Sequence, residues 1–224
     1  KEFPEKERQL WRIFDTTPFE DLCAVDNVDA DTVLRLLDYP AYFDLLKQPL
    51  PDNKQGIISR FLEDSMIKKN DAGSYSITNL GAILIAKKLD DFKILKRKAV
   101  RVIVYENTTR IKTIKEQVGS RGYASGFEGL VDFVSGLIPR NEIIGKALRK
   151  DVPMYPTIAI RELLANALIH QDFFIRGVGP MVEIFDDRIE ITNPGEPLVD
   201  TRRFVDTPPK SRNEALASLM RRFR

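Results

Sequence analysis

The stretch RELLANALIHQDF, residues Arg161–Phe173, sets polar side chains into a segment that is otherwise rich in Leu, Ala and Ile. Glu162, Asn166 and His170 are four residues apart, so on a helix they lie along one side with about 40° of drift per step. Such a stripe is either an ordinary solvated face or one wall of a binding site. Taken alone, a solvated face is the commoner reason for it, and the surrounding sequence must decide.

The apolar residues of this stretch predict a helix whose other side faces a core. Pro153 and Pro156 place its start, and Thr157 is its expected cap. Apolar residues recur at i, i+3, i+4, i+7 and i+8, which is the spacing of one helical face. The residues expected in the core are Ile160, Leu163, Leu164, Ala167 and Leu168.

A β-hairpin is predicted directly after this helix. The Gly-containing loop Arg176–Gly179 leads into the alternating segment Met181–Phe185. A turn at Asp186-Asp187 connects it to a second alternating segment, Arg188–Thr192. The second strand ends at Asn193-Pro194-Gly195, where proline and glycine predict a bend.

A second hairpin is predicted upstream, between two helices. Lys54–Glu63 is amphipathic, and Met66–Lys69 and Ser74–Ile77 form the two arms of the hairpin. Thr78 is the expected cap of a helix over Asn79–Lys88. Helix, hairpin and capped helix in this order are typical of a winged-helix module.

We place this winged-helix-like module at residues 51–96. Lys68 and Lys69 would then lie at the wing and contact the phosphates of duplex DNA. The alternative is a module that serves only as a scaffold or as a dimer contact.

The remaining segments are predicted from shorter signals, and residues 1–50 are interpreted as a helical lead. The predicted elements are helices over Glu5–Phe14, Val33–Leu37 (capped by Asp29 or Asp31), Ala41–Leu46, Phe127–Leu137 and Arg140–Arg149, a strand over Ala99–Tyr105, and a mobile loop over Gly119–Gly129.

Composition excludes several classes of protein. A hydrophobic content of 43% and a charged content of 30% are typical of a globular chain. The longest apolar run, Ala82–Ala86, is far shorter than the roughly 20 residues of a membrane span. The net charge of +2 is too small to indicate nucleic-acid binding by itself. The basic clusters Lys93–Arg101 and Lys210–Arg224 are expected to be solvated faces.

The cysteine and histidine content excludes several kinds of site. Cys23 is the single cysteine, which excludes an internal disulfide and a multi-cysteine zinc site and favours a reducing cytoplasm. We expect Cys23 to be a small buried hydrophobe rather than a nucleophile paired with His170. No G-x-x-x-x-G-K-[ST] segment occurs, so the sequence carries no helicase motor of that kind.

Two motifs resemble the ATP-binding fold of the GHKL superfamily, which includes gyrase, histidine kinases and the MutL repair proteins. The first motif of that superfamily is a helix with E-x-x-x-N, here Glu162 and Asn166. The second is a strand that ends in D-x-G-x-G, where this sequence has Asn193–Pro197 (NPGEP). The resemblance implies an α/β sandwich that binds ATP and Mg²⁺.

Three segments resemble one particular family, the bacterial Schlafen-type proteins that are described as transcriptional regulators or RecG-like ATP-binding proteins. They are YPTIAIRELLANALIHQDF, VEIFDDRIEITNPGEPL and SRNEALASLMRR. In that family an AlbA-like domain comes first, a linker of the winged-helix sort follows, and a GHKL-like domain comes last. The resemblance implies an AlbA-like domain before Lys1 and a Gly-rich loop after Arg224.

The resemblance assigns roles residue by residue. Glu162 corresponds to the general base that activates water, and Asn166 corresponds to the magnesium ligand that bridges the phosphates. An amide oxygen and water suit Mg²⁺, and one helical turn separates this ligand from the base. His170 and Asp172 have no fixed role in the superfamily, and we place them at the phosphate end of the nucleotide.

The bend departs from the superfamily pattern. Asn193 stands where the superfamily has an Asp that accepts a hydrogen bond from the adenine amino group, and an amide oxygen accepts it without the charge. Gly195 would let the backbone approach the base. Pro197 replaces the last glycine of the pattern. A site that binds nucleotide without turnover, or binds none, therefore stays open.

These observations predict an α+β chain in which residues 1–50 and 51–96 precede an incomplete GHKL-type (Bergerat) α/β sandwich over residues 97–224. The expected function is that of a cytoplasmic transcription regulator whose C-terminal domain binds Mg-ATP. Weak ATPase activity is left open, and a homodimer is expected by analogy only. The alternative is a DNA- or protein-binding scaffold that keeps the GHKL-like fold as architecture.

Overall fold

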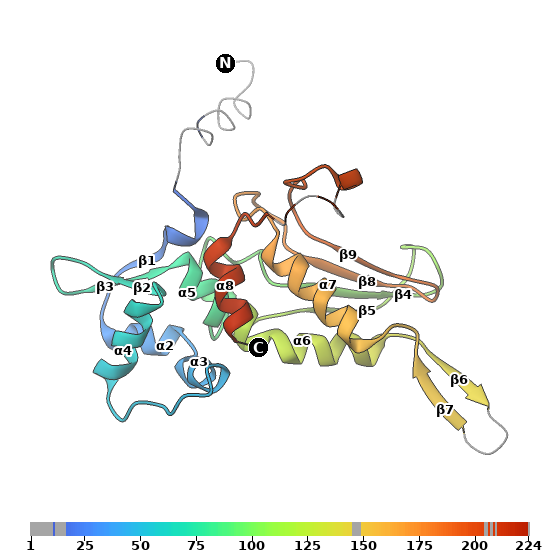
Figure 1. Cartoon of the computed structure of the whole chain (residues 1–224), viewed down its shortest axis with the longest axis horizontal. Coiled ribbons are helices and arrows are strands. Elements are labelled where there is room, and N and C mark those ends of the chain that lie inside the picture. The colour runs from blue at the N-terminus through green and yellow to red at the C-terminus, as the bar shows by residue number, and fades with distance from the viewer. Residues whose placement is uncertain are drawn as a thin grey trace.

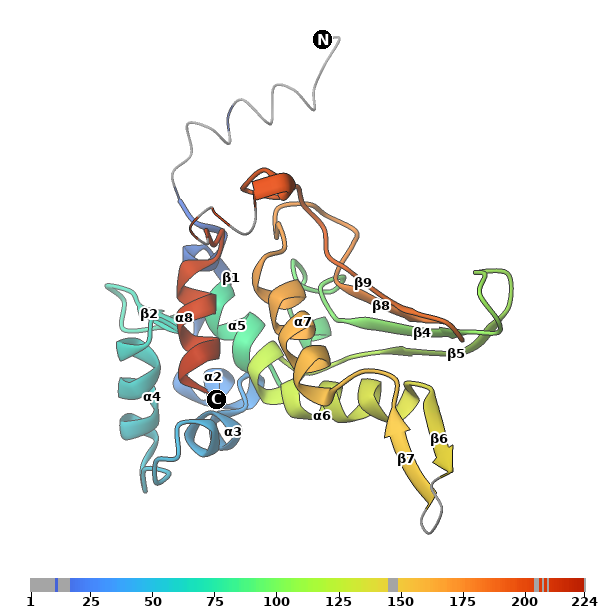
Figure 2. The ribbon, with the colours of Figure 1, turned by 45° about the vertical axis from the view of Figure 1, so that its right-hand side comes forward.

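The computed structural model describes residues 11, 17–144, 149–203, 206, 208 and 210–223. Figures 1 and 2 show two main parts, each built around a sheet, with a helix near the end of the chain lying between them. The helix expected over Glu5–Phe14 lies outside the described residues except for Trp11.

The first part is a small antiparallel sheet with short helices around it. Its elements are η1 (Phe19–Asp21), β1 (Cys23–Val28), α2 (Ala30–Leu36), α3 (Tyr39–Leu45), α4 (Lys54–Glu63), β2 (Ile67–Lys69), β3 (Tyr75–Thr78), α5 (Asn79–Ile85) and η2 (Leu89–Asp91). The strand order is β1-β3-β2. The predicted helix, hairpin and capped helix are present in that order as α4, β2–β3 and α5.

Side-chain caps explain where these helices begin. Asp29 caps α2, Asn53 caps α4 and Thr78 caps α5, each by accepting a backbone N–H three residues later. Thr78 is buried, and its hydroxyl also donates to the carbonyl of Met66 at 2.9 Å. The cap of α5 is thereby tied to the start of the hairpin.

The segment 1–50 contains the strand β1, although the sequence predicts only helices there. Val25 pairs with Ile77 of β3, and a β-branched residue suits this pairing. β1 stands at one end of the three-strand order. Cys23, at the start of this outer strand, is therefore exposed, and the prediction that it is buried is wrong.

The second part is built on a four-stranded sheet. Its elements are β4 (Arg101–Tyr105), β5 (Thr113–Val118), α6 (Tyr123–Leu137), β6 (Arg140–Ile144), β7 (Arg149–Pro153), α7 (Thr157–Ile169), β8 (Met181–Ile184), β9 (Ile189–Thr192), η3 (Thr201–Arg203) and α8 (Glu214–Arg222). The strand order is β5-β4-β8-β9, with β4 parallel to β8 and the other neighbours antiparallel. The hairpin predicted after the quoted helix is present as β8 and β9.

Helices α6 and α7 cover one face of this sheet (Figures 1 and 2). Val102 and Val182 point to that face and belong to the main hydrophobic cluster. Because side chains alternate along a strand, Ile103, Tyr105 and Phe185 point the other way and form a separate small cluster. We call the face that carries this small cluster the outer face.

Two local predictions in this part are wrong. The loop expected over residues 119–129 gives way to α6 at Tyr123, because burial of Tyr123 and Phe127 outweighs the helix-weakening glycines. The helix expected over Arg140–Arg149 is instead the hairpin β6–β7. Apolar spacing fits a helix there, but the adjacent β-branched residues Ile143 and Ile144 favour a strand.

Helix α8 returns the chain to the first part (Figure 2). The buried carboxylate of Glu20 accepts the N–H groups of Ala215 and Leu216, both at 2.9 Å, and so caps α8. The ring of Phe223 lies 5.9 Å from the ring of Tyr42. One hydrophobic cluster therefore runs through both parts of the molecule.

The predicted α+β class is confirmed, since both parts combine helices with a sheet. The proposed division at residues 50 and 96 stays a prediction. Among the described residues, no helix has the length and apolar character that a membrane span requires.

Candidate functional site

The polar stripe of the quoted segment lies on the exposed side of α7. Glu162 and Asn166 are exposed on the helix, and His170 follows as its C-cap residue. Ile160 and Leu164 on the opposite side are buried. The helix therefore presents the three polar side chains outward, as the spacing predicts.

Two details of α7 differ from the prediction. Leu163, expected in the core, is 50% exposed, because at 100° per residue it lies on the same side as Glu162 and Asn166. Ala165 and Ile169 are buried in the core instead. Pro156 stands at the N-cap without a side-chain hydrogen bond, so Thr157 is the first helical residue and not the cap.

The end of α7 and the bend after β9 lie against each other. The backbone N–H of Asp172 donates to the carbonyl of Pro194 at 2.7 Å. Gly195 has φ +120°, and a Cβ built on it would lie 2.9 Å from the Cβ of Asp172. Of the predicted site residues, the structure thus brings Asp172 and Gly195 into contact and requires glycine at the bend.

Arg212 joins this contact from the segment before α8. Its guanidinium donates to the carbonyl of Glu196 at 2.6 Å, and one of its nitrogens lies 2.8 Å from the place of a Cβ on Gly195. Burial lowers the pKa of His170 below its usual 6.5, and the positive charge of Arg212 lowers it further. The site therefore combines an imidazole, a guanidinium and a carboxylate.

Asn213 fixes the end of α7 and was given no role by the sequence. Its buried amide nitrogen donates to the carbonyls of Ile169 and Gln171 at 2.7 and 2.9 Å. These bonds satisfy carbonyls at a helix C-terminus that would otherwise be unpaired. A polar residue just before a helix suggests a cap of that helix, and nothing in the local sequence points to this contact with α7.

Lys98 holds the loop between α7 and β8 in place. Sequence analysis gave this residue no role. It is buried, and its ammonium donates to the carbonyls of Ile175 and Val178 at 2.6 and 3.2 Å. Burial lowers the pKa of Lys98 to about 8. The basic cluster Lys93–Arg101 was expected to be a solvated face. It contains one buried lysine, Lys98, which hydrogen-bonds the loop before β8.

Asn193 lies on the wall of a hollow of about 710 Å³ at the same end of the sheet. Arg101, Met181 and Thr192 also line this hollow, and they are cross-strand neighbours on the outer face. Glu162 and Asn166 are not among its lining residues. The bend after β9 therefore has the hollow on one side and the end of α7 on the other.

Lys68 and Lys69 are exposed on β2, as expected for a wing. The ammonium of Lys68 donates to the carbonyl of Asp21 at 2.7 Å. On the adjacent helix α4, Lys54 pairs with Asp31, and Arg60 pairs with Glu63. Three basic side chains near the wing, Lys54, Arg60 and Lys68, thus already have hydrogen-bond or ion-pair partners within the chain.

Comparison with known proteins supports an ATPase-like architecture for the C-terminal part. Residues 177–224 match the family described as "Putative ATP-dependent DNA helicase recG C-terminal". Asn193 and Gly195 lie inside the matched range, whereas α7 lies before it. The region after α7 is therefore similar to a RecG-like, GHKL-type region.

The whole chain is similar in fold to a solved structure, that of the DIP2311 protein from Corynebacterium diphtheriae. The TM-score is 0.62 at 17% sequence identity, over 96% of this chain and 42% of that protein. The likeness shows the fold alone, and this chain spans less than half of the length of its structural relative. No curated protein matches the sequence.

Proposed function

We propose that this chain binds Mg-ATP as a regulatory nucleotide, at the end of α7 and the bend after β9. The observation that carries the proposal is the hydrogen bond between Asp172 and Pro194, which joins the segment after the helix of the first GHKL-like motif to the bend that carries the second. The match of residues 177–224 to an ATPase-like family supports the same reading.

The exposed side of α7 carries apolar side chains beside its polar stripe, which supports the proposal that a ligand covers this side. Leu163 is 50% exposed and Ile158 is 72% exposed, and both flank the polar stripe. An ordinary solvated face would carry Lys and Glu in such positions, because exposed apolar side chains gain nothing from water. A bound nucleotide together with further polypeptide would cover both kinds of side chain.

The polar side chains of α7 and of the bend suit the metal, the phosphates and the base of Mg-ATP. The amide oxygen of Asn166 is a hard donor that suits Mg²⁺, and one such ligand with waters and phosphate oxygens makes a normal magnesium shell. Bound Mg²⁺ would offset the charge of the phosphates. Glu162 lies one turn away in the position of a general base, and His170 and Asp172 would face the phosphates. Asn193 would accept from the adenine amino group, with Gly195 beneath the base.

Hydrolysis is a separate claim that the proposal does not need. The Asn in place of Asp at residue 193 and Pro197 in place of glycine weaken the match to the superfamily motif. Turnover would require Glu162 to take a proton from water beside the terminal phosphate. A comparison of ADP release by the wild type and by Glu162→Gln, under conditions where both bind ATP, tests this.

The binding test is calorimetric titration of the chain with Mg-ATP. We expect saturable binding that depends on Mg²⁺ and is lost in Asn166→Ala. Gln55→Ala is the matched control, because it removes an exposed amide from α4, far along the chain from α7. Absence of binding by the wild type at millimolar ATP would contradict the proposal.

A second candidate function is transcription regulation through the first part, with Lys68 and Lys69 on DNA phosphates. The order β1-β3-β2 beside α4 supports a winged-helix-like shape. The ion pairs of Lys54 and Arg60 instead favour a scaffold that contacts protein. DNA binding predicts that retention of the protein on duplex DNA falls steeply with salt and is weaker for Lys69→Glu. Retention that does not change with salt would favour the scaffold.

A further inference from the structure

Two cationic side chains line the hollow on the outer face without an ion-pair partner among the described residues. Lys96 and Arg97 are both exposed at its wall. Arg101 on the same wall is different, because it pairs with Glu116 at 2.7 Å. The hollow thus holds positive charge that the described part of the chain leaves uncompensated.

The wall that carries this charge is fixed by its packing. A Cβ on Gly179 would lie 2.5 Å from the carbonyl oxygen of Arg97, so the glycine loop sits directly on the backbone of residues 97–98. Lys98 fastens the same loop through its bonds to Ile175 and Val178. Because these contacts already order the loop, little conformational freedom remains to be lost when a ligand binds.

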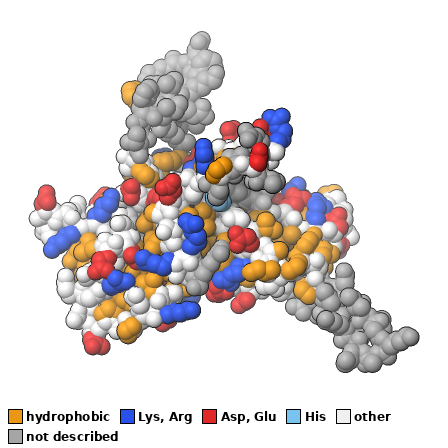
Figure 3. Space-filling model, in the orientation of Figure 1, with side chains coloured by type: hydrophobic (Ala, Val, Ile, Leu, Met, Phe, Trp, Pro, Cys, Tyr) orange, Lys and Arg blue, Asp and Glu red, His pale blue; other side chains and the backbone are white. Residues whose placement is uncertain are grey.

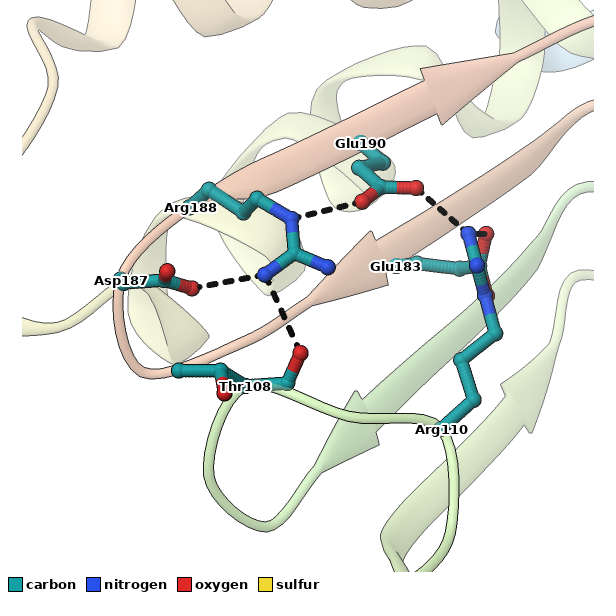
Figure 4. A network of polar contacts seen from close by, with 6 residues as sticks. All are labelled: Thr108, Arg110, Glu183, Asp187, Arg188 and Glu190. Atoms are coloured by element: carbon teal, nitrogen blue, oxygen red, sulfur yellow. Dashed lines mark hydrogen bonds and ion pairs between the residues drawn. The ribbon is translucent and has the colours of Figure 1, made fainter.

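Two other arginines on the outer face, Arg110 and Arg188, are neutralised by carboxylates, as Figure 4 shows. Arg110 donates to both oxygens of Glu183 at 2.6 and 2.9 Å and also pairs with Glu190. Arg188 donates to Glu190 at 2.6 Å. On the molecular face drawn in Figure 3, acidic and basic side chains are interspersed. Among the described residues, Arg110 and Arg188 on the outer face are thus paired, in contrast to Lys96 and Arg97 at the hollow.

We propose that this hollow binds a small phosphate-bearing anion, with Lys96 and Arg97 as the contacts to its phosphate oxygens. A volume of about 710 Å³ is that of a small-molecule site, which is commonly about 300–1,000 Å³. A nucleic-acid backbone needs cations spread along a track, whereas these two are confined to one hollow. The hollow shares Asn193 with the proposed ATP site, but Glu162 and Asn166, which would hold the magnesium and phosphate end of ATP, do not line it.

The test uses inorganic pyrophosphate without Mg²⁺, titrated into the full chain while the amide resonances of Gly177 and Gly179 are followed. We expect saturable shifts of both resonances. The double variant Lys96→Gln/Arg97→Gln should raise the Kd by about tenfold or more, because it removes two charge-assisted contacts. Its matched control is Arg35→Gln/Lys47→Gln, which removes one arginine and one lysine that are exposed in the first part.

Three results would overturn the proposal. The first is a failure of pyrophosphate to shift the glycine resonances, and the second is an equal weakening by both double variants. The third is a short oligonucleotide that binds the hollow when pyrophosphate does not, which would make the surface a nucleic-acid contact. Asn166→Ala separates the two sites: it should abolish Mg-ATP binding and leave the pyrophosphate shifts unchanged.

Discussion

Asp172 and Pro194 are joined by a 2.7 Å hydrogen bond between the backbone N–H of the first and the carbonyl of the second. Asp172 follows the helix that carries the E-x-x-x-N pattern, and Pro194 lies in the bend that takes the place of D-x-G-x-G. This backbone contact holds the end of the helix against the bend.

Gly195→Ala should destabilise the protein strongly. The residue has φ +120°, and its new Cβ would lie 2.9 Å from Asp172. We expect a loss of about 3 kcal/mol or more, from backbone strain and overpacking together. Gly73→Ala is the control, since Gly73 has φ +83° with no atom near a Cβ, and it should lose only about 1 kcal/mol. Urea unfolding measures both, and equal losses would show that the junction is not close-packed.

Asn213→Asp should destabilise the protein by about 2 kcal/mol, although the two side chains have the same shape. The carboxylate cannot donate to the carbonyls of Ile169 and Gln171, and buried acceptors would be left unpaired. Asn53→Asp is the matched control, because the exposed Asn53 side chain only accepts from the N–H of Gly56 and a carboxylate can do the same. If Asn213→Asp is as stable as the wild type in urea unfolding, the end of α7 does not depend on this amide.

Arg212→Gln should raise the pKa of His170. Removal of a positive neighbour makes protonation of the imidazole less costly, while burial, the larger cause, still keeps the pKa below 6.5. The sequence has one histidine, so a single imidazole resonance reports the titration by NMR. Arg35→Gln, an exposed arginine of α2, should leave the curve where it is. If Arg212→Gln does not move the pKa, the two groups are not neighbours.

Glu20→Gln should change how stability depends on pH. Burial raises the pKa of Glu20 above 4.5 in the folded chain, so the folded state binds a proton more readily than the unfolded state. The carboxylate therefore contributes less stability as the pH rises from 4.5 through its raised folded pKa. The free energy of unfolding of Glu20→Gln, minus that of the wild type, should increase over this range. A flat difference for Glu20→Gln would refute the assignment.

Local signals in the sequence were enough to predict several elements correctly. The helix over Lys54–Glu63 has the bounds that its amphipathic spacing predicts. The hairpin β8–β9 follows from alternation and a turn, which are also local. The sequence does not predict β1, because this strand is stabilised by pairing with β3, about fifty residues later, and not by a local signal. Tertiary burial likewise decided that α6 begins among glycines.

The candidate site was predictable only where a motif marked it. The pattern of residues marks Glu162, Asn166 and Gly195 as candidates, and their roles stay predictions. Lys98, Arg212 and Asn213 carry no pattern of their own, because each acts on backbone carbonyls that are distant in the sequence. The hollow beside Asn193 is lined from four separate segments, and no local signal could assemble it.

The central claim is that the outward polar stripe of α7 and the bend after β9 form a site for Mg-ATP. Its most direct test is titration of the wild type and of Asn166→Ala with ATP, each in the presence and absence of Mg²⁺. The proposal predicts saturable binding by the wild type that requires Mg²⁺ and disappears in the variant. Binding that is equal in both proteins, or no binding by the wild type at millimolar ATP, would contradict it.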